Sequence, residues 1–272
     1  MIPASFDYEV AGSADQAIEL LASAESPKLL AGGQSLLPLM KLRLARPATL
    51  IDIGGVAGLD GITDAGDHLA IGALTRHHVL EQDPLVLEHC PLLAQAASQV
   101  GDRQVRHRGT IGGSLAHADA AGDLPAIALT LDAELVARSA GGERVIPAAE
   151  FFRGFWTTAL EPGELLTEVR VRKHGGAGYA YLKFRRRALD WATVGVAAIV
   201  QDGDARVGLV NMGQQPIRAT AVEEAFDGDA ATAAAHADEG THPASDTFAS
   251  ADFRRHLARV LTRRALEECL KA

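Results

Sequence analysis

The chain has 272 residues with a formal net charge of −9, and 47% of its residues are hydrophobic. This length suggests about two domains with a well-buried core, and the ordinary composition is typical of a globular protein. The acidic balance argues against a protein whose task is to bind nucleic acid or an anionic membrane surface.

The two cysteines, Cys90 and Cys269, are far apart and lack the spacing of metal ligands. We therefore expect two reduced thiols, with a disulfide as the open alternative, and no iron–sulfur cluster or structural zinc held by this chain itself. Acidic Asp7 and Glu9 stand where a signal peptide would be basic, and no apolar run approaches the roughly 20 residues of a membrane span. A cytoplasmic location is the expectation.

The first part of the chain predicts a small parallel α/β unit. A capping box opens an amphipathic helix over Ser13–Ser23, and buried strands are expected at Lys28–Ala31 and Thr49–Ile53. Between the strands, Leu36–Leu44 is predicted to be a helix with Pro38 in its first turn. The glycine pair before this helix would then lie at a helix N-terminus, where unpaired N–H groups favour an anion.

The middle of the chain predicts a mixed or antiparallel sheet with helices. Frequent glycines from Val56 to about His89 indicate hairpins, and a further hairpin is expected over Glu134–Ile146. Helices are predicted at Pro91–Val100 and Leu124–Leu131, and Leu165–Arg172 has the pattern of a strand.

The last part begins after a glycine-rich linker at residues 175–178 and predicts a three-stranded antiparallel sheet packed with helices. The expected strands are Tyr179–Arg185, Thr193–Gln201 and Arg206–Asn211, and the expected helices are Ala221–Phe226 and Phe253–Leu270, with a surface loop over 227–250. The fold class is therefore α+β. A first domain over 1–175, with sub-parts of about 1–55 and 56–175, is followed by a C-terminal domain over 176–272.

Two short segments contain paired glycines next to a hydroxyl side chain, namely Ala31–Ser35 and Thr110–Ser114. Glycine pairs let backbone amides turn towards one point without side chains in the way, which suits a phosphate. A ligand with two adjacent phosphates could lie between the segments. An ordinary Gly-Gly turn is the alternative for either segment alone, and neither matches a Rossmann fingerprint or a P-loop.

These segments resemble the FAD-binding medium subunit of the molybdenum hydroxylases, the family of xanthine dehydrogenase and aerobic carbon monoxide dehydrogenase. The A-G-G-x-S motif and the L-x-P-x-x-K/R-x-R motif stand at Ala31–Arg43, and T-I-G-G-[NS] with H-x-x-P/A-x-x-D stands at Thr110–Asp123. The match continues through Arg46–Ile53, Tyr181–Arg187 and Asp190–Ala192. Each motif is weak singly, but their combination is specific.

The resemblance implies a set of FAD-binding residues. Ala31, Gly32, Gly33, Gln34 and Ser35, together with Thr110, Ile111, Gly112, Gly113 and Ser114, would hold the pyrophosphate. Leu36 would also bind the cofactor, and Val100 and Leu166 would line it. Asp123 would accept hydrogen bonds from the adenosine part, with the N-cap of its helix as an alternative role that could hold at the same time.

Two residues of the C-terminal part are implied in binding the flavin ring. Lys183 could reach the carbonyl edge of the flavin and stabilise the negative charge of the reduced form, although a solvated lysine is the alternative. Trp191 could stack on the ring or be a core aromatic residue. His117 and Asp119 are too few for a metal site, and we interpret them as polar groups near the cofactor. We expect no catalytic acid or base on this chain.

The function implied by the resemblance is that of a flavoprotein subunit, most similar to the carbon monoxide dehydrogenase medium subunit. It would accept electrons from [2Fe-2S] clusters on a small partner chain and pass them to an external acceptor. The molybdenum cofactor would lie on a large partner chain, in a dimer of heterotrimers. The alternatives are a free-standing FAD-dependent oxidoreductase and a non-redox nucleotide-binding subunit.

Overall fold

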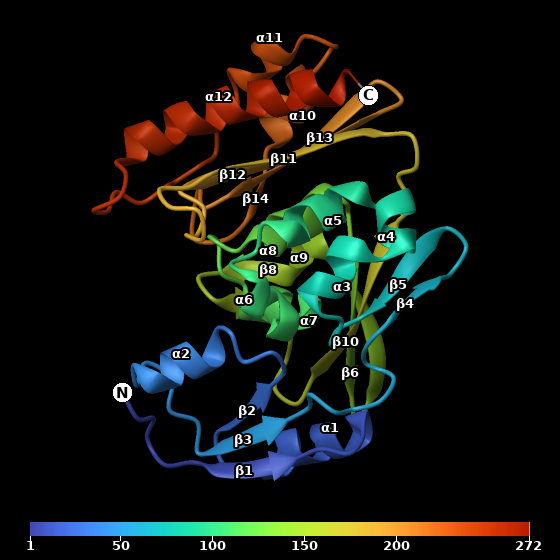
Figure 1. Ribbon diagram of the computed structural model, residues 1–272, viewed down its shortest axis with the longest axis vertical. Coiled ribbons are helices and arrows are strands. Elements are labelled where there is room, and N and C mark those ends of the chain that lie inside the picture. The colour runs from blue at the N-terminus through green and yellow to red at the C-terminus, as the bar shows by residue number, and fades with distance from the viewer. Residues whose placement is uncertain (272) are drawn as a thin grey trace.

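The structure, a computed structural model that describes residues 1–271, arranges the chain in three parts stacked along its long axis (Figure 1). Its sheets have the strand orders β1-β3-β2, β4-β5-β10-β6-β7, β11-β12-β13-β14 and β8-β9. The predicted α+β class is confirmed. None of the helices within residues 1–271 is both long and apolar enough to cross a bilayer.

The N-terminal part is a parallel three-stranded sheet with two helices. Its elements are β1 (Asp7–Val10), α1 (Ala14–Ser23), β2 (Pro27–Leu30), α2 (Leu36–Lys41) and β3 (Thr49–Asp52). Ser13 caps α1 as predicted, because its side chain accepts from the amide of Gln16 at 3.1 Å. Strand β1 was not predicted, since all four of its residues are exposed and it lacks the apolar run of a buried strand.

The middle part holds the largest sheet and most of the helices. Its strands are β4 (Ile62–Asp64), β5 (His68–Gly72), β6 (Glu134–Ser139), β7 (Gly142–Pro147), β8 (Phe152–Gly154), β9 (Thr157–Thr158) and β10 (Leu165–Arg172), and its helices are α3 (His77–Gln82), α4 (Pro84–His89), α5 (Pro91–Ser98), α6 (Arg103–Arg108), α7 (Ile111–His117), α8 (Asp123–Thr130) and α9 (Ala148–Phe151). The predicted hairpin β4–β5 is present, but residues 77–89 are helical. Asp83 caps α4 by accepting from the amide of Leu85 at 2.9 Å, and this signal was overlooked.

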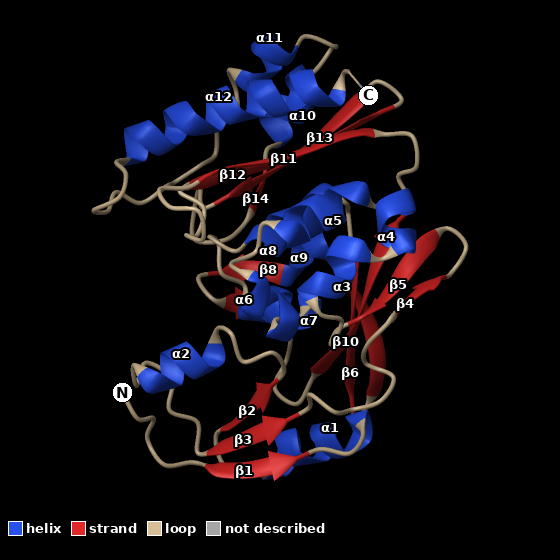
Figure 2. Ribbon diagram, in the orientation of Figure 1, coloured by secondary structure: helices blue, strands red, loops and turns tan. Residues whose placement is uncertain are grey.

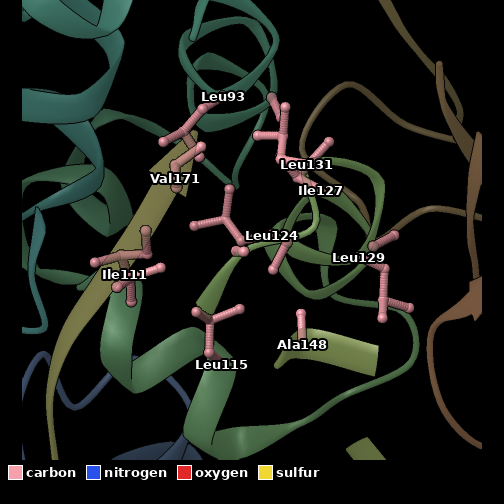
Figure 3. Close-up of a cluster of buried hydrophobic side chains, with 14 of the residues drawn as sticks. Leu93, Ile111, Leu115, Leu124, Ile127, Leu129, Leu131, Ala148 and Val171 are labelled. Atoms are coloured by element: carbon pink, nitrogen blue, oxygen red, sulfur yellow. The ribbon is translucent and has the colours of Figure 1, made fainter. Parts of the chain in front are cut away.

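A continuous apolar core fixes α7 and α8 against the middle sheet. Figure 3 shows Ile111 and Leu115 of α7 directed towards Leu124 and Ile127 of α8, with Val171 of β10 beside them. Each of these five side chains is buried. The helix that begins at Ile111 is therefore held in one position, and so is the glycine pair in its first turn.

The C-terminal part is a sheet with helices on both faces (Figure 2). Its elements are β11 (Gly178–Phe184), β12 (Val194–Gln201), β13 (Asp204–Val210), β14 (Ile217–Arg218), α10 (Thr220–Ala225), α11 (Ala230–Ala234) and α12 (Ala251–Cys269). The sheet has four strands instead of three, because the short β14 pairs with β13. One face packs on α12, and the other packs on α5 and α8 of the middle part.

The domain division at about residue 175 stays a prediction. The segment between β10 and β11 agrees with the expected linker, but helices α5 and α8 pack directly on the C-terminal sheet. The final residue of the predicted second domain, 272, lies outside the described residues. Cys90 and Cys269 are free and buried, as expected from the sequence.

Candidate functional site

The two glycine-containing segments lie against each other, at the place where α2 faces α6 and α7 in Figure 1. A Cβ atom on Gly32 would lie 2.8 Å from the Cα of Gly109 and would also meet the carbonyl oxygen of Arg108. A Cβ atom on Gly113 would lie 3.8 Å from the Cβ of Ala31. Only glycine at position 32 allows the backbones to approach this closely.

The first segment offers unpaired backbone amides. The N–H groups of residues 32–36 donate to no acceptor within residues 1–271, and the chain turns directly into α2 after them. The hydroxyl groups of Ser35 and Ser114 also lack a hydrogen-bond partner within this range. Consecutive free amides with nearby hydroxyls can bind the oxygens of a phosphate group.

The second segment forms the N-cap and the first turn of α7. Its amides are already paired: Ile111 donates to Thr75 O at 3.0 Å and Gly112 donates to Ala73 O at 2.8 Å. Gly113 donates to the Thr110 hydroxyl at 3.1 Å. The expectation that both segments present free amides is therefore wrong for this one. Ser114 and the packed backbone of the turn are what it can offer a ligand.

Two of the four glycines serve packing or backbone geometry. A Cβ atom on Gly112 would lie 2.5 Å from the Cβ of Ala73, so this glycine packs directly against residue 73. Gly33 has φ +73°, and its Cβ would lie 2.9 Å from a methyl carbon of Leu37. A larger residue at either position would disturb the fold before it filled a ligand site.

Positive charge surrounds the second segment. Arg76 donates to the backbone carbonyl of Arg108, and Arg76 and Thr110 form an isolated β-bridge. Burial, and then the nearby charge of Arg108, lowers the pKa of Arg76. His77 lies beneath Gly109 and is buried, and burial lowers its pKa to about 4, so that this ring is neutral at pH 7. These arginines suit an anion placed beside residues 32–36.

A buried polar cluster joins the middle part to the C-terminal sheet. The Nζ of Lys183 lies 2.9 Å from Oδ2 of Asp123 and donates to the carbonyl of Gln99 at 3.1 Å. The hydroxyl of Tyr181 donates to the other carboxylate oxygen of Asp123. Burial raises the pKa of Asp123, while the Lys183 ammonium and the Tyr181 hydroxyl oppose that shift. Burial, followed by the Asp123 charge, raises the pKa of Tyr181.

The free edge of β11 is completed by two glutamines, Gln95 within α5 and Gln99 at its C-cap. Gln95 Oε1 accepts from the amide of Tyr181 at 2.7 Å, and Gln99 donates through Nε2 to the carbonyl of Tyr181 at 3.3 Å. Gly195 on β12 leaves room for the tyrosine, since a Cβ atom there would lie 3.0 Å from its hydroxyl. These contacts set the position of the strand that carries Lys183.

The structure decides several alternatives that the sequence left open. Asp123 is not an N-cap, because the cap position is Gly122 and the Asp123 carboxylate is bound to Tyr181 and Lys183. The solvated interpretation of Lys183 is wrong, since its side chain is only 2% exposed. Trp191 is 59% exposed and is therefore not a core aromatic residue.

The remaining predicted residues lie in different surroundings. Leu166 is buried in the main core, whereas Val100 is half-buried at the end of α5. At the end of α7, the Nε2 of His117 lies 3.9 Å from the Oδ2 of Asp119. Sequence reasoning missed Tyr181, although it lies two residues before Lys183 and therefore on the same face of a strand.

Comparisons with known proteins agree over nearly the whole chain. The family model for the FAD binding domain in molybdopterin dehydrogenase matches residues 4–172, and that for the CO dehydrogenase flavoprotein C-terminal domain matches residues 179–269. The 6-hydroxypseudooxynicotine dehydrogenase complex subunit alpha of Paenarthrobacter nicotinovorans is 40% identical, over 99% of this chain and 96% of its own. The carbon monoxide dehydrogenase medium chain of Hydrogenophaga pseudoflava is 39% identical, over 98% and 97%.

The fold agrees with solved structures as well. A structure of carbon monoxide dehydrogenase from Hydrogenophaga pseudoflava, in a form that lacks the Mo-pyranopterin moiety of its cofactor, contains a chain that superposes with a TM-score of 0.96. The two chains are 39% identical, and the match covers 100% of this chain and 99% of the other.

Proposed function

The chain belongs to the family of FAD-binding medium subunits of molybdenum hydroxylases and is a flavoprotein subunit of an oxidoreductase; from this premise we propose where it holds FAD and with which chains it works. The site with the best support is the space between residues 32–36 and the start of α7. The observation that carries this proposal is the run of unpaired amides over residues 32–36 beside the closely packed Gly32.

The pyrophosphate of FAD would lie on the amides of residues 32–36, with the hydroxyls of Ser35 and Ser114 as further donors. The Arg76 side chain, which donates to the carbonyl of Arg108 next to Gly32, adds positive charge nearby. Val100 and the exposed ring of Trp191 would line the rest of the cofactor, as the resemblance implies, whereas Leu166 is buried in the main core and fits the alternative of an ordinary core residue. These contacts remain predictions, supported by the free donors that the chain places there.

Bound FAD would supply the capacity to take up two electrons and release them to an acceptor. The chain's own contribution is to position and electrostatically tune the ring. Lys183 is held by Asp123 and by the carbonyl of Gln99, so its ammonium group has a fixed place at the inner face of β11. A fixed cation beside the flavin would favour the negatively charged reduced form.

The partners would be a small iron–sulfur chain and a large molybdenum chain, assembled as a dimer of heterotrimers in the cytoplasm. Support comes from two relatives, one of which is a subunit of a dehydrogenase complex and the other a medium chain of carbon monoxide dehydrogenase. The two cysteines of this chain are both buried and lie far apart in the sequence, so the clusters would have to be supplied by another chain.

The test is to co-express the full chain with its proposed partner chains, to purify the complex, and to record a flavin absorption spectrum and a native mass spectrum. We expect one FAD for each copy of this chain, together with an iron–sulfur chain and a molybdenum-containing chain. A colourless complex would favour the non-redox subunit. A coloured chain that oxidises a small substrate without partners would favour the free-standing oxidoreductase.

A further inference from the structure

Asn211, the only asparagine in the chain, follows β13 in a backbone conformation that most residues avoid. Its φ is +61°, in the left-handed region that asparagine adopts more readily than bulkier or branched residues. The residue is half-buried, and its backbone amide and its side chain contact two different parts of the chain. Asparagine therefore suits this position both through its backbone preference and through the donors of its side chain.

The backbone amide of Asn211 contacts the loop between α7 and α8. It donates to the carbonyl of Ala120 at 2.7 Å, and Ala120 is buried. This loop, residues 118–122, joins the helix that carries Ser114 to Asp123, the first residue of α8. Because both of these residues are predicted FAD contacts, the position of the loop affects the geometry of the cofactor site.

The side chain of Asn211 contacts the segment on which Trp191 lies. Its Nδ2 donates to the carbonyl of Ala192 at 2.8 Å and approaches the carbonyl of Thr193 at 3.4 Å. Both partners are acceptors, so they determine which end of the side-chain amide faces them. Ala192 and Thr193 are buried, whereas their neighbour Trp191 is 59% exposed. The backbone of this segment is therefore held in place while the indole ring stays accessible to a ligand.

A buried arginine holds the same segment. Arg254 of α12 is only 3% exposed and donates to the carbonyl of Thr193, and its Nη2 lies 2.6 Å from the Oδ2 of Asp246. The amide of Thr193 donates to the carbonyl of Phe184 at 2.8 Å, at the open end of the β11–β12 pairing. Arg254 thus fixes the segment to α12, and Asn211 fixes it to the loop between α7 and α8.

We propose that Asn211 is a positioning residue for the flavin ring, because it holds Trp191 at a fixed place beside the loop that leads into Asp123. The inference rests on the proposed function, in which Trp191 lies against the cofactor. A side chain that stacks on a planar ring has to keep one orientation, and hydrogen bonds to its neighbours supply that restraint before the ligand arrives.

The test compares Asn211→Gly with wild type, each as the full chain saturated with FAD. Glycine keeps the positive φ and removes the side-chain amide. A stacked indole ring quenches flavin fluorescence by electron transfer, so we expect the emission of bound flavin to rise about twofold in Asn211→Gly. Trp191→Leu should raise it at least as much. The matched control is Asp202→Gly, at a residue with φ +55° in the turn before β13, which should leave the emission unchanged.

Two further measurements separate positioning from a general loss of stability. If Asn211 acts through Trp191, the double variant Asn211→Gly with Trp191→Leu should emit no more than Trp191→Leu alone. The second measurement needs no flavin. In a Trp156→Phe background Trp191 is the only tryptophan, and its fluorescence anisotropy should fall when Asn211→Gly is added.

The outcomes separate this proposal from the function itself. Unchanged flavin emission or unchanged Trp191 anisotropy in Asn211→Gly overturns the proposal, and so do additive effects in the double variant. Bound FAD that does not respond to Trp191→Leu removes this role of Asn211 and leaves the pyrophosphate site intact. A wild-type chain that binds no FAD would defeat the proposed function, whereas the anisotropy would still report whether Asn211 holds Trp191.

Discussion

The Nζ of Lys183 lies 2.9 Å from the Oδ2 of Asp123, and the two side chains are only 2% and 4% exposed. Asp123 is the first residue of α8, and Lys183 is on β11, so the pair connects the middle part to the C-terminal sheet. An ion pair buried this deeply contributes to stability only while both partners are present, since each charge has lost its water.

Removal of the lysine alone should therefore destabilise the chain strongly. Lys183→Met leaves the Asp123 carboxylate buried without a cation, and we expect a loss of about 3–5 kcal/mol in the free energy of unfolding. The double variant Asp123→Asn with Lys183→Met should lose less than the sum of the two single changes. Denaturant unfolding of the four proteins in this cycle measures the coupling.

The control for this cycle is the exposed pair of Arg255 and Asp252, which lie 3.0 Å apart on α12. Its coupling should not exceed about 1 kcal/mol. Equal coupling in the two cycles would mean that burial adds nothing to the inner pair.

The same two residues should move the flavin potential in opposite directions. Lys183→Met leaves a negative group near the ring and should lower the potential, because the reduced form carries more negative charge. Asp123→Asn leaves the cation uncompensated and should raise it. Spectroelectrochemical titration of FAD-loaded protein measures both. Shifts of the same sign would show that the charge of this pair does not act on the flavin.

How much of this site the sequence could predict depends on how local each signal was. The capping box at Ser13, the glycine segments and the long apolar strands can each be recognised from residues a few positions apart, and they were found. The unpaired amides of residues 32–36 follow from such a local pattern. The paired amides of Ile111 and Gly112 do not, because their acceptors on Ala73 and Thr75 lie far back along the chain.

The ion pair and the edge contacts of β11 were out of reach for a related reason. Asp123 and Lys183 were each singled out, but 60 positions separate them in the sequence. Only the packing of α5 and α8 on the C-terminal sheet brings them together. The helices over residues 77–89 were missed because short helices with few apolar residues have weak periodicity, and tertiary packing decides their conformation.

Substitution of Gly32 should empty the cofactor site by separating the two segments. In Gly32→Ala the new methyl group meets the backbone at Arg108 and Gly109, and backbone cannot rotate away as a side chain can. Such overpacking costs about 1–3 kcal/mol of folding stability. If separating the segments removes the same free energy from binding, the flavin affinity falls roughly 5-fold to 150-fold. Fluorescence titration of the apoprotein with FAD gives the dissociation constant.

Gly55→Ala is the matched control, because no atom lies within 4 Å of the Cβ position there. Its flavin affinity should equal that of the wild type. If Gly32→Ala also bound FAD normally, the close approach at Gly32 would be irrelevant to binding.

Gln95 should be needed to hold β11 in place. Gln95→Leu leaves the buried amide of Tyr181 without its acceptor at 2.7 Å, and we expect a loss of about 1–3 kcal/mol in unfolding free energy. Hydrogen exchange at Tyr181 should accelerate accordingly. The control Gln104→Leu changes an exposed glutamine on α6 and should leave the exchange rate at Tyr181 as it was. If the exchange rate at Tyr181 were the same in Gln95→Leu and in wild type, the contact of Gln95 with β11 would not stabilise that strand.

His77 should make the region before α7 sensitive to acid. Burial, with the charges of Arg76 and Arg106 as further causes, lowers its pKa from 6.5 to about 4 in the folded chain. Between these values the unfolded chain binds more protons than the folded chain, so stability is full above pH 6.5 and is lost as the pH falls towards 4. By linkage, this residue alone should remove about 2 kcal/mol of stability between pH 7 and pH 5.

His77→Phe tests this prediction, because Phe keeps the ring against Gly109 and the buried Nδ1 of His77 has no hydrogen-bond partner to lose. The variant should lose less stability than wild type between pH 7 and pH 5, as measured by denaturant unfolding at both values. His256→Gln, at an exposed position of α12, should keep the wild-type pH dependence. Parallel curves for His77→Phe and wild type would show that the protonation of His77 does not control acid stability.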